Sequence, residues 1–198
     1  MNSVREYWKL KDTDFQNESL WNWYTLRAEP ELVAKALEKR ERVYLVLINT
    51  PQEVVIAGEP SACKELMQEL KCESHEIPVT DVVHCPPVQS EYEEIKKVHT
   101  NKVVDKPKVD FFSAADYTTT KLDSEILADI IARFYGRNVD FSKLVEEVYR
   151  SGARIFIDMG PRSSCARWIS ENLGNRPHLS LGINRKGMDL SLIHISEP

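Results

Sequence analysis

The sequence predicts an α/β fold in two parts, and three observations support this prediction. Short apolar or β-branched runs alternate with amphipathic helical stretches along the chain. Pro30 and Pro60 each stand where a helix would begin, because the first helical position tolerates a missing N–H. The segment Asn49-Thr50-Pro51-Gln52 separates two apolar runs with residues that favour turns. We therefore expect a strand-rich first half and a second half in which helices and strands alternate.

The first half reads as six elements between residues 22 and 83. Strands are predicted at Trp23–Leu26, Val43–Ile48, Val54–Ala57 and His75–Val83, and the middle two form a hairpin. Helices are predicted after Pro30 and after Pro60, where apolar residues recur at helical spacing. The order β-α-β-β-α-β is that of the split βαβ, or ferredoxin-like, arrangement.

The pattern of the second half of the sequence predicts a parallel sheet, of which this chain holds only some strands. Amphipathic helices are expected over residues 122–134 and 141–149. Short strands are expected at Val109–Phe112, Ala153–Asp158 and His178–Leu181. Strands that alternate with helices are typical of parallel α/β sheets. Three such strands make a small sheet, which indicates that it belongs to a larger one.

Composition excludes several classes of function. The chain has 198 residues, 26 Lys and Arg against 31 Asp and Glu, and a net charge of −5, which disfavours nucleic-acid binding. The longest apolar run, Val43–Ile48, is far shorter than the ~20 residues of a membrane helix, so no membrane association is expected. The N-terminus lacks the apolar core of a signal peptide. Four cysteines without a regular spacing favour reduced thiols and a cytoplasmic location.

His84 is the strongest single candidate for chemistry. It follows the last predicted strand of the first half, where a cleft between two subdomains would form. An imidazole titrates near neutral pH and can act as a general base. The alternative is a packed or exposed histidine at a strand end, because one histidine is not a motif.

A metal site is not expected. Two histidines and three cysteines cluster within a short stretch, at Cys63, Cys72, His75, His84 and Cys85. Their spacing matches no standard zinc site, and Cys63 falls on the apolar stripe of a predicted helix.

Three segments resemble malonyl/acyl-CoA:acyl-carrier-protein transacylases. The stretch from Val43 to Gly58 (VYLVLINTPQEVVIAG) is similar to that family's N-[ST]-P-x-x-x-V-[IV]-[AS]-G hairpin, and His84 falls near its active-site histidine. The stretch from Ala153 to Pro161 (ARIFIDMGP) is similar to its strand and Gly-Pro turn. The likeness is greatest to the acyltransferase domains of polyunsaturated-fatty-acid synthases and related iterative polyketide synthases.

This resemblance implies a Ser-His enzyme with a ferredoxin-like subdomain inserted in an α/β-hydrolase-like core. His84 would be the general base, and the main-chain carbonyl of Asp140, which matches a family Gln, would orient it. Asn49 matches a hairpin residue near the pantetheine cleft, with a plain turn residue as the alternative. Acyl-CoA would be a substrate rather than a resident cofactor. The partners would be an acyl carrier protein with its phosphopantetheine and other domains of a multidomain synthase.

The nucleophile of that family is missing from the sequence. Its serine lies in a G-x-S-x-G turn, and the 198 residues contain no such motif. The family's carboxylate-binding arginine, which follows that serine, is missing as well. The resemblance therefore implies a C-terminal fragment that carries the histidine half of the site and is inactive alone. The alternative is a non-catalytic ferredoxin-like binding or regulatory module.

The expected organisation has four parts. Residues 1–21 form an entry segment, 22–83 the small subdomain, and 84–186 part of the hydrolase-like subdomain. Residues 187–198 form a non-native tail, because Ser191–Pro198 resembles a translated sequencing adapter. Basic residues outnumber acidic ones in residues 150–186, which would suit an acidic carrier protein or be ordinary solvated charges.

Overall fold

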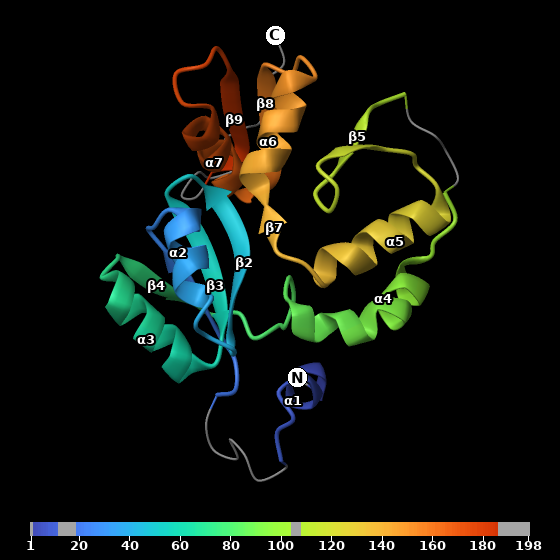
Figure 1. Ribbon diagram of the computed structural model, residues 1–198. Coiled ribbons are helices and arrows are strands. Elements are labelled where there is room, and N and C mark those ends of the chain that lie inside the picture. Colours follow the sequence, from blue (N-terminus) through green and yellow to red (C-terminus); the bar gives the residue numbers. More distant parts are fainter. Residues whose placement is uncertain (1, 12–18, 104–107, 186–198) are drawn as a thin grey trace. The chain divides into compact units, whose positions relative to one another are not determined.

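The computed structural model describes residues 2–11, 19–103 and 108–185 and divides the chain into two compact units (Figure 1). The first unit ends at Leu144 and the second begins at Val145. The predicted tail at residues 187–198 lies outside the described residues. No helix in the described ranges combines the length and apolar character that crossing a membrane would require.

The first unit holds one larger sheet, one small hairpin and most of the helices. Its strands are β1 (Asn22–Leu26), β2 (Val43–Thr50), β3 (Glu53–Gly58), β4 (Ser74–Ile77), β5 (Phe111–Ser113), β6 (Thr118–Thr120) and β7 (Val139–Asp140). Its helices are α1 (Asn2–Tyr7), α2 (Pro30–Leu37), α3 (Pro60–Leu70), the 3-10 turn η1 (Pro86–Glu91), α4 (Tyr92–His99) and α5 (Ser124–Tyr135). Helix α6 (Phe141–Arg150) begins in this unit and ends in the second.

The predicted order β-α-β-β-α-β is confirmed, from β1 to β4. The strands lie in the order β4-β1-β3-β2-β7, antiparallel except for the parallel pair β2 and β7. The fourth strand is shorter than expected, because it ends at Ile77 rather than at Val83. Pro78 follows directly, and proline has no N–H to donate to a neighbouring strand.

Strand β3 is central and fully buried, and its two faces serve two hydrophobic clusters. Val54 and Ile56 pack with the side chains of α2 and α3 on one face. Val55 and Ala57 pack on the other face with Trp21, Cys85 and other core residues. The alternation follows from the two-residue period of a strand. Burial on both faces explains why the sequence of β3 is a continuous apolar run.

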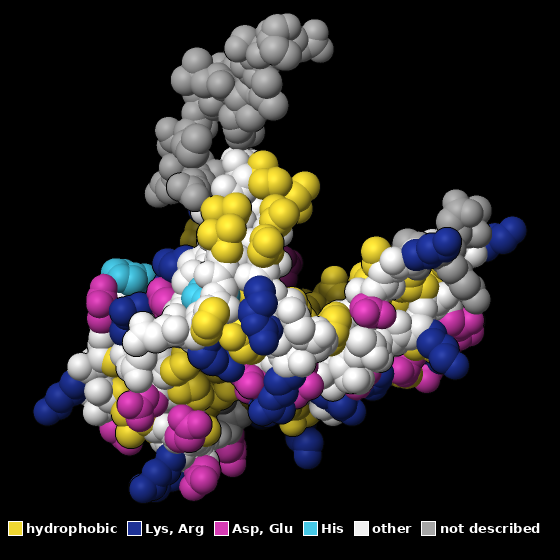
Figure 2. All heavy atoms as spheres, turned by 90° about the horizontal axis from the view of Figure 1, so that it is seen from above, with side chains coloured by type: hydrophobic (Ala, Val, Ile, Leu, Met, Phe, Trp, Pro, Cys, Tyr) yellow, Lys and Arg dark blue, Asp and Glu magenta, His cyan; other side chains and the backbone are white. Residues whose placement is uncertain are grey.

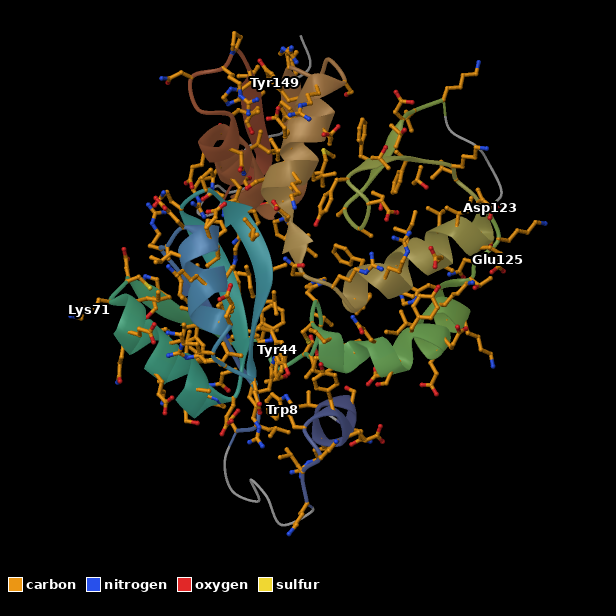
Figure 3. The ribbon with its side chains drawn as sticks, in the orientation of Figure 1. Trp8, Tyr44, Lys71, Asp123, Glu125 and Tyr149 are labelled. Carbon is orange, nitrogen blue, oxygen red and sulfur yellow. The ribbon has the colours of Figure 1, made fainter. Side chains whose placement is uncertain are left out.

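Three N-terminal tryptophans belong to this second cluster. Trp8, Trp21 and Trp23 are buried, and Nε1 of Trp8 donates to the hydroxyl of Tyr44 at 2.8 Å. Figure 3 shows the labelled Trp8 and Tyr44 side chains facing one another at this contact. Desolvation raises the pKa of the Tyr44 hydroxyl to about 12, so it stays neutral and able to accept this bond. Part of the entry segment therefore packs into the core.

In the helix-rich part of the first unit, the short strands differ from those predicted. Strand β5 was expected to join a parallel sheet, but it forms an antiparallel hairpin with β6. The two-residue strand β7, which the sequence did not predict, pairs with β2. Helices α4 and α5 lie side by side (Figure 1). The side chain of Asp123 caps α5 by accepting from the backbone N–H groups of Glu125 and Ile126.

The second unit contains β8 (Ile155–Arg162), α7 (Ser164–Leu173) and β9 (Leu179–Arg185). The strands β8 and β9 are parallel, as predicted. Gly160 and Pro161 do not end the strand, which continues to Arg162 with an irregular register. At the start of α7 the side chain of Ser163 makes no capping bond, and the carboxylate of Asp158 accepts from the backbone N–H of Ala166 at 3.0 Å.

Gly58 makes the close approach of β2 and β3 possible, and replacing it tests the sheet. A Cβ at this position would lie 2.1 Å from the backbone oxygen of Arg42, and its φ of +154° strains other residues. We expect Gly58→Ala to lower the free energy of unfolding by at least about 2 kcal/mol. Gly136→Ala is the control, since only the flexible side chain of Gln89 would have to move. Equal stability of the two variants in chemical denaturation would contradict this packing.

Candidate active site around His84

His84 lies after β4, at the start of the segment that leads into η1. Its backbone is in the left-handed region, with φ of 61°, which is uncommon for a residue with a side chain. The backbone N–H donates to the carbonyl of Tyr135 at 2.6 Å. This hydrogen bond to a residue 51 positions later in the chain helps to hold His84 in the left-handed conformation. That conformation sets the direction of its side chain.

The imidazole is fixed by a second carbonyl from the same helix end. Nδ1 of His84 lies 2.9 Å from the carbonyl oxygen of Phe134. A carbonyl only accepts, so this contact assigns the proton of the neutral ring to Nδ1. The Phe134 ring lies edge-on to the imidazole at 4.5 Å between centroids. The second nitrogen, Nε2, is thereby left unprotonated, with the lone pair that a general base needs.

Two opposing effects set the basicity of His84. Burial disfavours the charged ring and lowers its pKa below the ordinary value of 6.5, and this effect is the larger. The bond to the Phe134 carbonyl favours the protonated ring and raises the pKa. The balance keeps the imidazole neutral at pH 7, which is the form that accepts a proton.

His84 borders two cavities of the first unit. The first, of about 560 Å³, is also lined by Tyr117, Arg137, Asp140 and Lys143. The second, of about 520 Å³, is lined mainly by aliphatic and aromatic side chains such as Val83 and Ile95. The histidine thus stands between a space with charged walls and a space with apolar walls.

The carbonyl that faces His84 is not the one expected from the sequence. The predicted partner was Asp140, but the oxygen within hydrogen-bond distance of Nδ1 belongs to Phe134. Asp140 lines the same cavity and has other contacts. Its backbone N–H donates to the Tyr117 hydroxyl at 2.9 Å, and its carboxylate accepts from the backbone N–H of Lys143 at 3.0 Å. Its side chain therefore caps the first turn of α6.

Asn49 is buried in the hairpin rather than in the wall of the 560 Å³ cavity. Its Nδ2 donates to the carboxylate of Glu53 at 3.0 Å, across the turn between β2 and β3. Glu53 in turn lies 3.9 Å from the guanidinium of Arg27. A role in holding the hairpin follows directly from these contacts, and the predicted role in substrate binding stays a prediction.

The cysteines and histidines of the middle region do not come together. Cys63 and Cys85 are fully buried in different clusters, and burial raises the pKa of each thiol to about 12. His75 is exposed and pairs with Glu73. Within the described ranges, no three His, Cys, Asp or Glu side chains are arranged to hold a metal ion.

Sequence reasoning missed the groups that surround His84. The carbonyl oxygens of Phe134 and Tyr135 leave no trace in residue type, because every residue has one. Tyr117 and Lys143 were also missed, although Lys143 stands three positions after Asp140, the spacing of a cap. One related signal was present in the sequence, the end of the predicted helix at residue 134.

The chain resembles two curated proteins over a small part of their length. No protein-family model matches the chain. The chain is 26% identical over 202 residues to a component of the polyunsaturated fatty acid synthase of Thraustochytrium sp., and the match covers 95% of the chain and 10% of that protein. It is 26% identical over 165 residues to erythronolide synthase EryA2 of Saccharopolyspora erythraea, covering 77% of the chain and 4% of that protein. The chain thus spans a small part of these curated relatives.

Solved structures give the fold. The acyltransferase domain from the second module of the salinomycin polyketide synthase superposes with a TM-score of 0.72 and 21% identity, over 87% of this chain and 41% of that one. An acyl carrier protein S-malonyltransferase from Vibrio cholerae superposes with a TM-score of 0.72 and 22% identity, over 84% of this chain and 56% of that one. The chain therefore has the α/β fold of acyltransferase domains, over about half the length of those structures.

The protonation of His84 can be observed directly. We expect its imidazole to titrate with a pKa below 6.5 and to carry its proton on Nδ1 when neutral, because burial opposes the charge and the Phe134 carbonyl holds the proton. Nitrogen-15 NMR of the ring measures both quantities. The same ring in the chain unfolded in urea is the control, with a pKa of about 6.5. A folded-state pKa above that control, or a proton on Nε2, would be inconsistent with this geometry.

Proposed function

We propose that this chain supplies the histidine side of an acyltransferase site, which moves an acyl group from coenzyme A to an acyl carrier protein. The observation that carries the proposal is the orientation of His84, with Nδ1 on the Phe134 carbonyl and Nε2 free to accept a proton. The fold of acyltransferase domains supports it, as does the name of the Vibrio cholerae enzyme. The parent would be a synthase of fatty acids or polyketides, as its curated relatives are.

We propose that the chain holds the two expected subdomains, which meet at residues 83 and 84 and so do not coincide with the two compact units that meet at Leu144 and Val145. Residues 22–83 would be a ferredoxin-like subdomain, which the antiparallel order β4-β1-β3-β2 supports. Residues 84–186 would be part of an α/β-hydrolase-like core, which the parallel pair of β8 and β9 supports. His84 then stands at the beginning of the core, directly after the small subdomain.

In the first half-reaction, a serine supplied from outside these 198 residues attacks the thioester. Nε2 of His84 takes the proton from the serine hydroxyl while the serine oxygen bonds to the acyl carbon of the thioester. The carbon–sulfur bond then breaks, and the protonated His84 returns the proton to the sulfur of coenzyme A. The product is an acyl ester on the serine and free coenzyme A.

In the second half-reaction, the phosphopantetheine thiol of the carrier protein takes the acyl group. Nε2 of His84 accepts the thiol proton as the sulfur attacks the ester carbon. The carbon–oxygen bond breaks, and the proton passes from His84 to the serine oxygen. The low pKa of His84 suits both steps, because the neutral ring is the reactive form at each start.

The other predicted site residues take supporting roles in this proposal. The Phe134 carbonyl would orient His84, the role first expected of the Asp140 carbonyl. Asp140 would shape the cavity by capping α6. Asn49 would hold the β2–β3 hairpin and border the pantetheine path. The reaction uses acyl-CoA and the carrier's phosphopantetheine as substrates and requires no resident cofactor.

Replacing His84 tests the proposal. In the full-length polypeptide encoded by the gene, we expect His84→Ala to reduce transfer from radiolabelled malonyl-CoA or acetyl-CoA to a phosphopantetheinylated carrier protein by about 10²-fold or more. The rate should rise with pH through a midpoint below 6.5, because the neutral ring is the active form.

His75→Ala is the matched control, because His75 is an exposed histidine of the same unit. It should leave the transfer rate unchanged. Transfer that survives His84→Ala would remove His84 from the chemistry. Full-length protein that transfers no acyl group, with or without His84, would instead favour the alternative of a non-catalytic module.

A further inference from the structure

Two residues that line the 560 Å³ cavity have left-handed backbones although neither is glycine. The φ angle is 61° at His84 and 55° at Tyr117. This conformation is unfavourable for an aromatic residue and persists only where the surrounding structure holds it. Residues strained in this way concentrate at functional sites. The reaction steps of the proposed function use His84 but not Tyr117, which leaves the second strained residue of this cavity without a role.

The turn that carries Tyr117 is held together by Ser113, which is buried. Oγ of Ser113 accepts from the backbone N–H groups of Ala115 at 3.1 Å and Asp116 at 3.3 Å. The carbonyl of Ser113 accepts from the backbone N–H of Tyr117 at 2.8 Å. These three bonds close the turn between β5 and β6. They fix the backbone from which the Tyr117 side chain projects.

The last turn of α5 holds both this hairpin and the base. Two nitrogens of the Arg133 guanidinium bind the two carboxylate oxygens of Asp116, one of them at 2.8 Å. A bidentate pair fixes orientation as well as distance. Arg133 directly precedes Phe134, whose carbonyl lies on Nδ1 of His84. Neighbouring residues of α5 thus position His84 and the tip that carries Tyr117 (Figure 1).

The far end of the Tyr117 side chain is tied as well. Its hydroxyl accepts from the backbone N–H of Asp140 at 2.9 Å, and Asp140 pairs with Ile48 of the main sheet. The ammonium of Lys143 lies 5.7 Å from the centroid of the ring. The ring therefore spans from the hairpin to β7. It cannot move out of the cavity without giving up its bond to Asp140.

The 560 Å³ cavity is the space that suits the acyl group. Phe134, whose carbonyl holds Nδ1 of His84, lines the 520 Å³ cavity and is not among the residues that line the 560 Å³ one. The side of the imidazole that carries Nε2 therefore borders the cavity with Tyr117. That cavity also has an aliphatic wall, formed by Leu37, Val43 and Leu45.

Selection among linear acyl groups must come from walls that touch them, because such groups differ in length and not in charge. Figure 2 shows Lys and Arg side chains mixed with Asp and Glu side chains over the face it presents, so charge on that face offers no selection. We propose that Tyr117 is a specificity-determining residue whose ring limits the length of the acyl group. A long chain would have to displace a ring that is held at both ends, and a short chain would not. This inference rests on the proposed function and adds a substrate class to it, short acyl thioesters.

Removing the ring tests the proposal. The measurement is kcat/KM of the full-length polypeptide for octanoyl-CoA and for acetyl-CoA, with a phosphopantetheinylated carrier protein as acceptor. We expect Tyr117→Gly to raise the ratio of octanoyl to acetyl transfer by about tenfold or more, because the chain gains the space of the ring. The left-handed backbone favours glycine, so this variant should fold. Tyr117→Leu serves in its place if circular dichroism shows that the glycine variant is unfolded.

Two control variants separate the ring from other effects. Tyr117→Phe keeps the ring and loses only the hydroxyl, so the ratio should stay within about threefold of the original. Tyr7→Ala removes an exposed tyrosine of the same unit, on α1, and should leave the ratio unchanged.

The outcomes separate this inference from the proposed function. An unchanged ratio in the folded Tyr117→Gly variant would overturn the inference, because the ring would then not meet the acyl chain. An equal loss of transfer from both thioesters would also overturn it, since Tyr117 would then contact the pantetheine arm or support the structure. Either result in an enzyme that depends on His84 would keep the proposed function. A raised ratio in an enzyme that does not depend on His84 would keep this inference and end the role of His84, and full-length protein that transfers neither group would end both.

Discussion

The carbonyl end of α5 is the constraint on which the candidate site depends. The last carbonyls of a helix have no partner within it and must find donors elsewhere. The carbonyls of Phe134 and Tyr135 accept from the two N–H groups of His84, one on the ring and one on the backbone. The helix end thereby gains its missing donors, and the histidine gains a fixed position and tautomer. The same two hydrogen bonds supply donors to the last carbonyls of α5 and hold the imidazole in the tautomer that can act as a base.

The same arrangement sets two forces against each other. The negative end of a helix favours a protonated imidazole, and burial favours a neutral one. Burial has the larger effect at His84. The burial comes from the neighbouring segments, because Cys85 and Val88 anchor the following turn in the core beneath β3. The sheet therefore contributes to the chemistry by fixing the depth at which the imidazole lies.

Local signals were sufficient to predict much of the first unit. Pro30 and Pro60 begin helices, and the predicted turn joins β2 and β3, although β2 continues to Thr50 before the chain turns. His84 was singled out because it follows a predicted strand end at the expected junction of two subdomains, although β4 itself ends earlier, at Ile77. Its partner could not be found in this way, since a backbone carbonyl has no residue type, and Asp140 was chosen in place of Phe134.

Strands β5, β6 and β7 were missed or misassigned because two or three residues carry no periodicity. The strand β8 was cut short because Gly160 and Pro161 look like a turn, whereas the ladder resumes after a shift in register.

The central claim is that Nε2 of His84 is the base at the thioester, and a crystal structure of the full-length polypeptide with coenzyme A tests it most directly. The account predicts that the pantetheine sulfur lies within about 3.5 Å of Nε2 of His84, while Nδ1 stays on the Phe134 carbonyl. A pantetheine arm that ends elsewhere, or an imidazole turned so that Nε2 faces Phe134, would contradict the account.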